Sequence, residues 1–159
     1  SGLAFVREPG ALPAAMAISA EYLPSSGAAR SPANFTPELS RRARGVEVWA
    51  ALRSLGRSGV AEMLERNCRQ ARRFAARLAD AGHEILNDVV LNQVLVSFGS
   101  PQATQRVIAA VQEDGTCWCG GTVWQGRTAM RISVCSWATT DADVELSIEA
   151  ILRAARHAR

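Results

Sequence analysis

One arginine is the first candidate for chemistry in this sequence. Residues 114–140 read as a β-hairpin with strands at 116–124 and 129–135 and a turn at 125–127, because β-branched, aromatic and small residues flank a glycine-containing turn. Arg131 falls in the second strand, which is otherwise apolar on its inward face. A buried guanidinium group needs a partner or a ligand to offset its loss of hydration. Arg131 is therefore a candidate binding residue for an anionic group.

Four cysteines offer a second kind of site. They stand at positions 68, 117, 119 and 135, too few and too unevenly placed for a disulfide scaffold in a chain of this length. In a strand, Cys117 and Cys119 would point to the same face and could share a metal with Cys135 on the neighbouring strand. No Cys-x-x-Cys or His-x-x-x-His pair supports a metal, so we favour small buried apolar side chains and predict no metal.

Composition favours a soluble globular chain of one domain, or one domain plus part of another. The 159 residues are 48% hydrophobic and 21% charged. No apolar run approaches the ~20 residues that span a bilayer and no signal peptide is visible, so we expect a cytoplasmic protein without a membrane partner. All 18 basic residues are arginine, the net charge is +3, and the two signs are interspersed. This pattern argues against a nucleic-acid partner.

The N-terminal part contains a strand and a long loop by pattern. Residues 2–7 read as a buried strand with nothing upstream to pair with, so the chain looks cut at its start. From there to Thr36 the composition is rich in Ala, Ser, Pro and Gly, which is typical of a mobile loop with a short helical turn near 11–17. This loop holds the only tyrosine, Tyr22. Loops of such length are more often functional or disordered than simple connectors.

Two long helices are expected next. The first covers residues 37–55, opened by Thr36 and ended by Gly56, with so little polar surface that we expect burial on more than one side. Ser58 can cap a second helix over residues 59–81. Its buried stripe is expected to comprise Val60, Met63, Leu64, Ala71, Phe74, Ala75 and Leu78, and its solvated face the arginines at 66, 69, 72, 73 and 77.

An antiparallel sheet completes the expected fold. Strands are expected near residues 83–87 and 91–98, followed by a helix over 101–114, the hairpin, and a last helix over 141–157. The two helices are capped by Ser100 and Thr140, and Gly115 ends the first. The inward positions are expected to be Thr104, Val107, Ile108 and Val111 in the first helix and Val144, Ile148, Ile151, Leu152 and Ala155 in the second. The sequence thus predicts the α/β fold class, with an α+β small domain. In this domain about four antiparallel strands are covered by helices on one face.

Five segments carry a resemblance to a known family. They are SGLAFVR at 1–7, EYL at 21–23, LSRRAR at 39–44 with Trp49 after it, LGR at 55–57 and MRISVCS at 130–136. In their order and spacing they resemble the C-terminal part of the group II pyridoxal-phosphate-dependent amino-acid decarboxylases, relatives of the aromatic amino-acid, histidine and glutamate decarboxylases. The resemblance covers essentially all 159 residues.

The resemblance implies the C-terminal domain of the aminotransferase-like, fold type I enzymes. Residues 1–36 would be a strand and mobile loop left over from the large cofactor domain, and residues 37–159 the small domain. In the family, the first segment directly follows the lysine that holds pyridoxal 5'-phosphate as a Schiff base, and this chain contains no lysine. We therefore expect a fragment without cofactor-binding residues that is inactive alone.

The same resemblance assigns roles to four residues. Tyr22 matches a loop tyrosine thought to deliver a proton when the loop closes over the site, and Arg131 matches a position that holds the substrate's α-carboxylate. Arg41 and Arg42 resemble a pair near the loop base and domain interface, where structural pairing or anchoring of the loop is expected in preference to a chemical role. The complete protein is expected to be a homodimeric decarboxylase that acts on an L-amino acid.

Three alternatives stay open. Arg131 can form a structural salt bridge with a neighbouring acid in place of a substrate contact. The chemistry can be that of an aminotransferase or another pyridoxal-phosphate lyase of the same fold, which would form a different product. The chain can also be a non-catalytic dimerisation or binding module.

Overall fold

The computed structural model describes residues 2–17, 31–38 and 42–157. The chain divides into two compact units, Ser1–Gly56 and Arg57–Arg159, and each is described by itself. The assignment of residues 1–36 to a larger cofactor domain stays a prediction.

Among the described residues of the first unit, the regular secondary structure is helical only. The short helix α1 spans Ala11–Met16, as the helical turn near 11–17 predicted, and a 3-10 turn, η1, spans Pro32–Phe35. The strand expected at residues 2–7 is wrong, since this segment pairs with no other strand among the described residues. A β-strand is stabilised by its hydrogen-bonded neighbour, and without one Phe5 is left 91% exposed.

Helix α2 runs from Arg44 to Asp80 and is interrupted at Gly56. Gly56 has a φ of 64°, in the left-handed region where glycine is favoured, so the predicted end of the first helix is confirmed. The predicted start at Pro37 is wrong, because the Thr36 hydroxyl donates to the Glu38 carbonyl at 2.5 Å and caps no helix. Burial on more than one side is also wrong, since Trp49 is 65% exposed in this chain.

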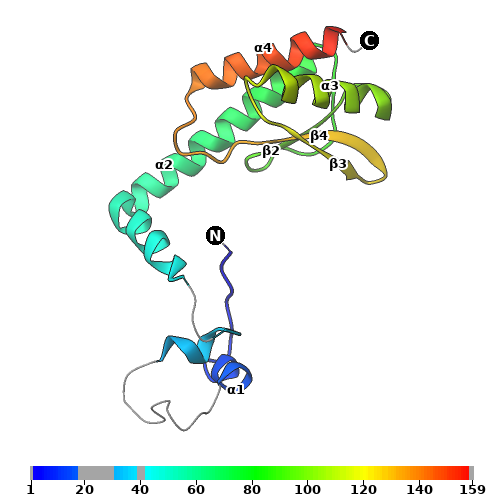
Figure 1. The fold of residues 1–159 in the computed structure, drawn as a ribbon. Helices are drawn as coiled ribbons and strands as arrows, with labels where there is room; N and C mark the ends of the chain where they lie inside the picture. Colours follow the sequence, from blue (N-terminus) through cyan, green and yellow to red (C-terminus); the bar gives the residue numbers. More distant parts are fainter. Residues whose placement is uncertain (1, 18–30, 39–41, 158–159) are drawn as a thin grey trace. The chain divides into compact units, whose positions relative to one another are not determined.

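The second unit contains a sheet of four antiparallel strands. They are β1 Glu84–Ile85, β2 Gln93–Ser97, β3 Gly120–Trp124 and β4 Arg127–Ser133. Their order is β1-β2-β4-β3, so β4 lies between β2 and β3. Helix α3, Pro101–Asp114, helix α4, Asp141–His157, and the second part of α2 lie on one face of the sheet (Figure 1). The predicted fold class is confirmed.

Local sequence signals set the ends of these elements. The Ser100 hydroxyl accepts a hydrogen bond from the Ala103 N–H at 3.1 Å, which caps α3 where predicted. Thr140 and Asp143 form a reciprocal pair at the start of α4, with N–H···O distances of 3.2 and 2.9 Å. The hairpin turn is shorter than expected, since only Gln125 and Gly126 lie between the strands. Both have positive φ, 48° and 77°, as a two-residue turn of type I′ requires.

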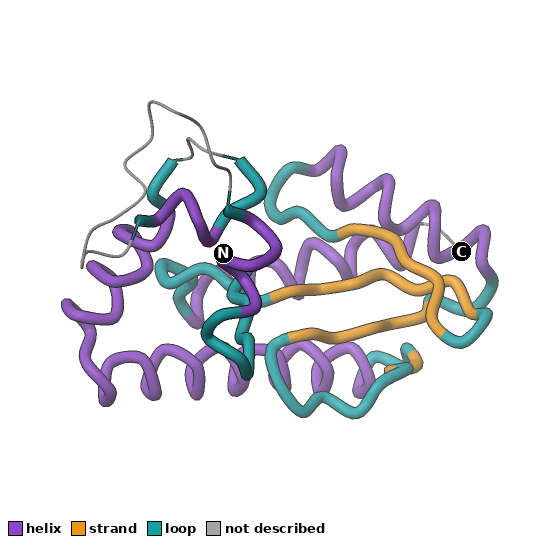
Figure 2. The backbone as a smooth tube through the Cα atoms, turned by 90° about the horizontal axis from the view of Figure 1, so that it is seen from below, coloured by secondary structure: helices purple, strands orange, loops and turns teal. Residues whose placement is uncertain are grey.

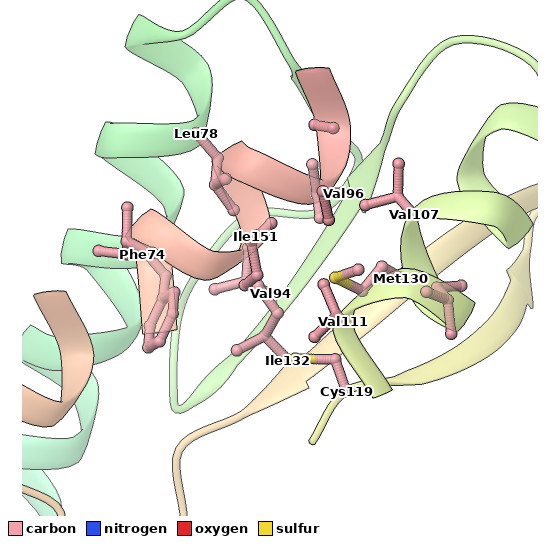
Figure 3. Close-up of a cluster of buried hydrophobic side chains, with 14 of the residues drawn as sticks. Phe74, Leu78, Val94, Val96, Val107, Val111, Cys119, Met130, Ile132 and Ile151 are labelled. Atoms are coloured by element: carbon pink, nitrogen blue, oxygen red, sulfur yellow. The ribbon is translucent and has the colours of Figure 1, made fainter. Parts of the chain in front are cut away.

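A single hydrophobic core joins the helices to the covered face of the sheet (Figure 3). Leu78 of α2, Val111 of α3 and Ile151 of α4 are each 0% exposed, and they pack over Met130 and Ile132 of β4. All of the inward positions predicted for α3 are buried, and those predicted for α4 are buried except Leu152, which is partly buried. Burial of apolar surface, which contributes about 25 cal/mol per Å², is the main stabilising contribution to this unit.

The predicted stripe on α2 is only partly buried. Buried positions on α2 begin at Asn67, and Leu64, expected in the core, is 55% exposed. Its arginine face is not simply solvated either, because Arg73 and Arg77 both bind Glu145 of α4, the latter at 2.6 Å. These ion pairs hold α2 against α4.

Candidate functional site

Strand β4 places Arg131 on the face of the sheet that the helices leave uncovered. Successive side chains of a strand point to opposite faces, so Met130 and Ile132 enter the core while Arg131 points the other way. Figure 2, a view from below, shows the strands of this unit in front of its helices. The expectation of an inward-facing Arg131 is therefore wrong, and its side chain is exposed in this chain.

The register gives Arg131 two different neighbours. On one side it lies opposite Leu95 of β2, which is 7% exposed, and on the other opposite Gly120 of β3, which has no side chain. Nothing lies within 4 Å of the position that a Cβ at Gly120 would take. An apolar wall on one side and open space on the other leave room for a ligand beside the guanidinium group.

A carboxylate on the same face is already paired. Glu84 of β1 binds Arg127 of β4 through two hydrogen bonds of 2.7 and 2.5 Å. The hydrogen bond from Arg127, and to a smaller extent the positive charge of Arg127, holds the pKa of the Glu84 carboxyl below its usual value. The Arg131 side chain makes no hydrogen bond or ion pair with any residue that the structure describes. Within the described part of the chain, its guanidinium group is thus available for an anion.

None of the other predicted site residues lies in the described part of the second unit. Tyr22 and Arg41 lie outside the described residues. Arg42 belongs to the first unit, is exposed, and forms an ion pair with Glu47 at the start of α2. This pairing is of the structural kind that the sequence suggested for Arg42.

The structure reveals a second cluster, formed by two cysteines that the sequence analysis considered as metal ligands and interpreted as small buried apolar side chains. Cys117 and Cys119 precede β3, in the segment that joins it to α3. Cys119 belongs to the hydrophobic core, and Cys117 packs against it. No group of three His, Cys, Asp or Glu side chains that could hold a metal is found among the described residues. The Glu84–Arg127 pair was also missed, because it joins strands that are far apart in the sequence.

The residues of this chain do not by themselves fit pyridoxal phosphate. Covalent attachment needs a lysine amine, and all 18 basic residues of the sequence are arginine. We therefore assign no step through the cofactor to this chain. No helix in the described part of the chain is long and apolar enough to cross a membrane.

Comparison with solved structures shows the fold. Oryza sativa TDC, solved with PLP and tryptamine, matches with a TM-score of 0.85 at 19% identity, over 96% of this chain and 34% of that one. Mouse CSAD matches with a TM-score of 0.72 at 17% identity, over 90% and 34%. Catharanthus roseus tryptophan decarboxylase, in complex with L-tryptophan, matches at 0.69 and 18%, over 79% and 29%. The chain thus spans about a third of the length of these proteins.

Comparison with protein families gives the assignment. Residues 1–99 match the family model described as the pyridoxal-dependent decarboxylase conserved domain. The match takes in the first unit, all of α2 and strands β1 and β2, which is more than half of the chain. On this match, the chain belongs to the pyridoxal-dependent decarboxylase family.

Proposed function

We propose that this chain is the C-terminal part of a pyridoxal-phosphate-dependent amino-acid decarboxylase, a carboxy-lyase that converts an L-amino acid to an amine and CO₂. The family match over residues 1–99 carries the proposal. The fold supports it, because 96% of the chain superposes on a protein solved with PLP and tryptamine. Alone, the chain is inactive, since the residue that would hold the cofactor is not among its own.

Arg131 is proposed to bind the substrate's α-carboxylate. A guanidinium group can hold a carboxylate through two parallel hydrogen bonds, and a strand backbone fixes its position better than a loop would. The pairing of Glu84 with Arg127 removes one competitor for Arg131. A carboxylate that is bound too firmly loses CO₂ slowly, so in a decarboxylase Arg131 contributes to substrate binding more than to the chemical step.

Tyr22 is proposed to deliver the proton that replaces CO₂. The proposal rests on the family resemblance and on the position of Tyr22 in a long loop rich in small residues. Tyr22→Phe in the complete protein should reduce amine formation while substrate binding survives. Unchanged turnover would rule out the role.

The reaction itself is tested in the complete protein that contains this chain. Purified protein with pyridoxal phosphate is incubated with amino acids labelled at the carboxyl carbon, beginning with L-tryptophan, the ligand of one solved relative. Release of labelled CO₂ with amine formation is expected. Keto-acid formation would identify an aminotransferase, and no turnover of any amino acid would leave a binding or dimerisation module.

The Arg131 contact has a matched control on the same strand and face. Arg131→Met is expected to raise KM at least about tenfold with a smaller effect on kcat, the cost of losing a charge-assisted pair. Arg127→Met removes the same charge from a residue that is bound to Glu84. It should leave KM within about twofold. Equal effects of the two variants would contradict a specific carboxylate contact.

We also propose that the complete protein is a cytoplasmic homodimer. Large apolar side chains of the first unit are solvent-exposed in this chain, with Phe5 at 91% and Trp49 at 65%, and such groups are usually covered in a complete assembly. Light scattering on the complete protein tests the dimer, and cell fractionation tests the compartment. A monomer at micromolar concentration would overturn the first part.

A further inference from the structure

The segment between α3 and β3 is held in place on both sides of its two cysteines. At its start, Asp114 accepts hydrogen bonds from Thr116 and binds Arg153 of α4 at 3.1 Å. Near its end, the Gln112 side chain donates to the Cys119 carbonyl at 2.8 Å. These contacts fix the backbone around a Cys-x-Cys sequence.

The two thiols of this segment face the protein interior together. Cys119 is 4% exposed and belongs to the buried cluster with Val111 and Ile132 (Figure 3), while Cys117 is half-buried and packs against the same core. The intervening Trp118 is 76% exposed. Because the middle side chain points outward, the two sulfur atoms lie on the same side of the segment, toward the core.

The position of this segment permits a bond between the two sulfur atoms. In a regular strand, residues two apart have Cα atoms ~6.6 Å apart, at the upper edge of the 4.4–6.8 Å range that disulfides span. Strand β3 begins only at Gly120, and Thr116 and Cys117 lie in a bend. The distance between the Cα atoms of Cys117 and Cys119 can therefore be shorter than the ~6.6 Å of a regular strand, as a disulfide requires.

The environment gives the two thiols different reactivities. Hydrogen bonding from the Cys119 thiol, with a smaller contribution from Ser147, lowers the pKa of Cys117 to about 7 against the opposing effect of burial. The same contact and burial raise the pKa of Cys119. A half-buried thiolate beside a retained thiol is the arrangement of an attacking and a resolving cysteine.

We propose that Cys117 and Cys119 form a redox modification site that a low-molecular-weight disulfide, such as oxidised glutathione, converts into an intrachain disulfide. The Cys117 thiolate attacks one sulfur of the small disulfide, forms a mixed disulfide and releases one small thiolate. Cys119, losing its proton to that thiolate, attacks the Cys117 sulfur and releases the second small thiolate, which takes up from water the proton that Cys117 had lost. The two protein thiols are oxidised and one disulfide is reduced to two thiols, so atoms and electrons balance.

The site goes beyond the proposed decarboxylation and is independent of it. Its closed ring contains only one intervening residue, so the bond is expected to be strained and readily reduced again. The bond would form directly before Gly120, the cross-strand neighbour of Arg131. Oxidation is therefore expected to alter the segment next to the proposed carboxylate-binding residue.

The test uses the 159-residue chain with Cys68→Ser and Cys135→Ser, which leaves the pair as the only cysteines. This protein is equilibrated in glutathione buffers with an increasing fraction of oxidised glutathione, quenched with acid, alkylated and digested with trypsin. The peptides are then analysed by mass spectrometry. The peptide of residues 107–127 should become lighter by two hydrogen atoms, escape alkylation, and return to the alkylated form after treatment with dithiothreitol. Two alkylated cysteines at every ratio, or a stable glutathione adduct alone, would overturn the proposal.

The alkylation rates of the two cysteines can be measured in the chain without substitutions, so this second test does not depend on the folding of a variant. At pH 7, native-state alkylation by iodoacetamide should be at least about tenfold faster at Cys117 than at Cys119, since about half of a thiol with a pKa of about 7 is ionised. Equal rates at the two positions would contradict the division of roles. As a matched control, Cys117→Ser on the two-serine background should leave Cys119 without an intrachain partner and yield no lighter peptide.

Discussion

The exposure of Leu64 and the burial of Leu78 on the same helix provide a sharp test of the fold. The apolar pattern of α2 places both residues on one buried stripe, whereas the structure leaves Leu64 55% exposed and Leu78 0% exposed. Truncating a fully buried leucine to alanine costs about 2–5 kcal/mol, from lost burial plus the cavity left behind. Leu78→Ala should therefore lower the free energy of unfolding by about 3 kcal/mol.

Leu64→Ala is the matched control, with the same change of side chain on the same helix. More than half of the Leu64 surface remains in water, so the loss should stay below about 1 kcal/mol, and alanine's higher helix propensity offsets part of it. The difference between the variants is then roughly 2 kcal/mol. For a unit of roughly 100 residues this corresponds to a separation of about 8–16 °C in Tm.

Urea unfolding followed by circular dichroism and tryptophan fluorescence measures both variants. Trp118, Trp124 and Trp137 report on the second unit and Trp49 on the first. The expected result is a lower midpoint for Leu78→Ala at an unchanged denaturant slope. Equal destabilisation by the two variants would refute the placement of α2 against the sheet, and would favour the uniform stripe that the sequence predicts.

Further predictions concern the hairpin turn, the cap of α4, stability in acid and covalent binding of the cofactor. Gly126→Ala should lower the free energy of unfolding in urea by about 1 kcal/mol, because φ is 77° at this position, whereas Gly120→Ala, in open space without positive φ, should lower it by less. Thr140→Ala should cost about 1 kcal/mol by removing the cap of α4, with unchanged stability contradicting the cap. Hydrogen bonding from Arg73 lowers the pKa of Glu145, so the ionised Glu145 stabilises the fold above pH 4.5 and this stabilisation is lost as the pH falls further. The Glu145→Gln variant should therefore be as stable as the parent chain in acid and less stable than it at neutral pH. Borohydride reduction with pyridoxal phosphate should leave no adduct on any internal residue, as peptide mapping would show, because the chain has no lysine.

The elements that local signals specify were predictable from the sequence. Helix α3 was predicted with both ends correct, since Ser100 and Gly115 are strong start and stop signals at α-helix termini. Helix α4 and the hairpin followed from the same kind of evidence. Periodicity also identified the inward positions of α3, because the whole length of that helix lies on the sheet.

The failures share a physical cause, which is that local pattern does not reveal what covers a surface. Residues 2–7 have the composition of a strand but find no partner among the described residues. Leu64 continues an apolar stripe beyond the point where α2 meets the sheet. The Glu84–Arg127 pair depends on strand order, which a single sequence does not give.

Arg131 shows how the argument for a binding residue changes once the face is known. Its charge is solvated in this chain, so desolvation supplies no reason for a ligand, and Arg131→Met should change the stability of the 159-residue chain by less than about 0.5 kcal/mol. The case for a ligand rests on geometry, because the nearby carboxylate of Glu84 is taken by Arg127 and Gly120 leaves space beside the strand. If the complete protein covers this face, the guanidinium group loses water and needs a carboxylate to replace it. Arg131→Met would then stabilise the substrate-free protein or leave it unchanged while weakening substrate binding, whereas a structural salt bridge would make the same variant destabilising without substrate.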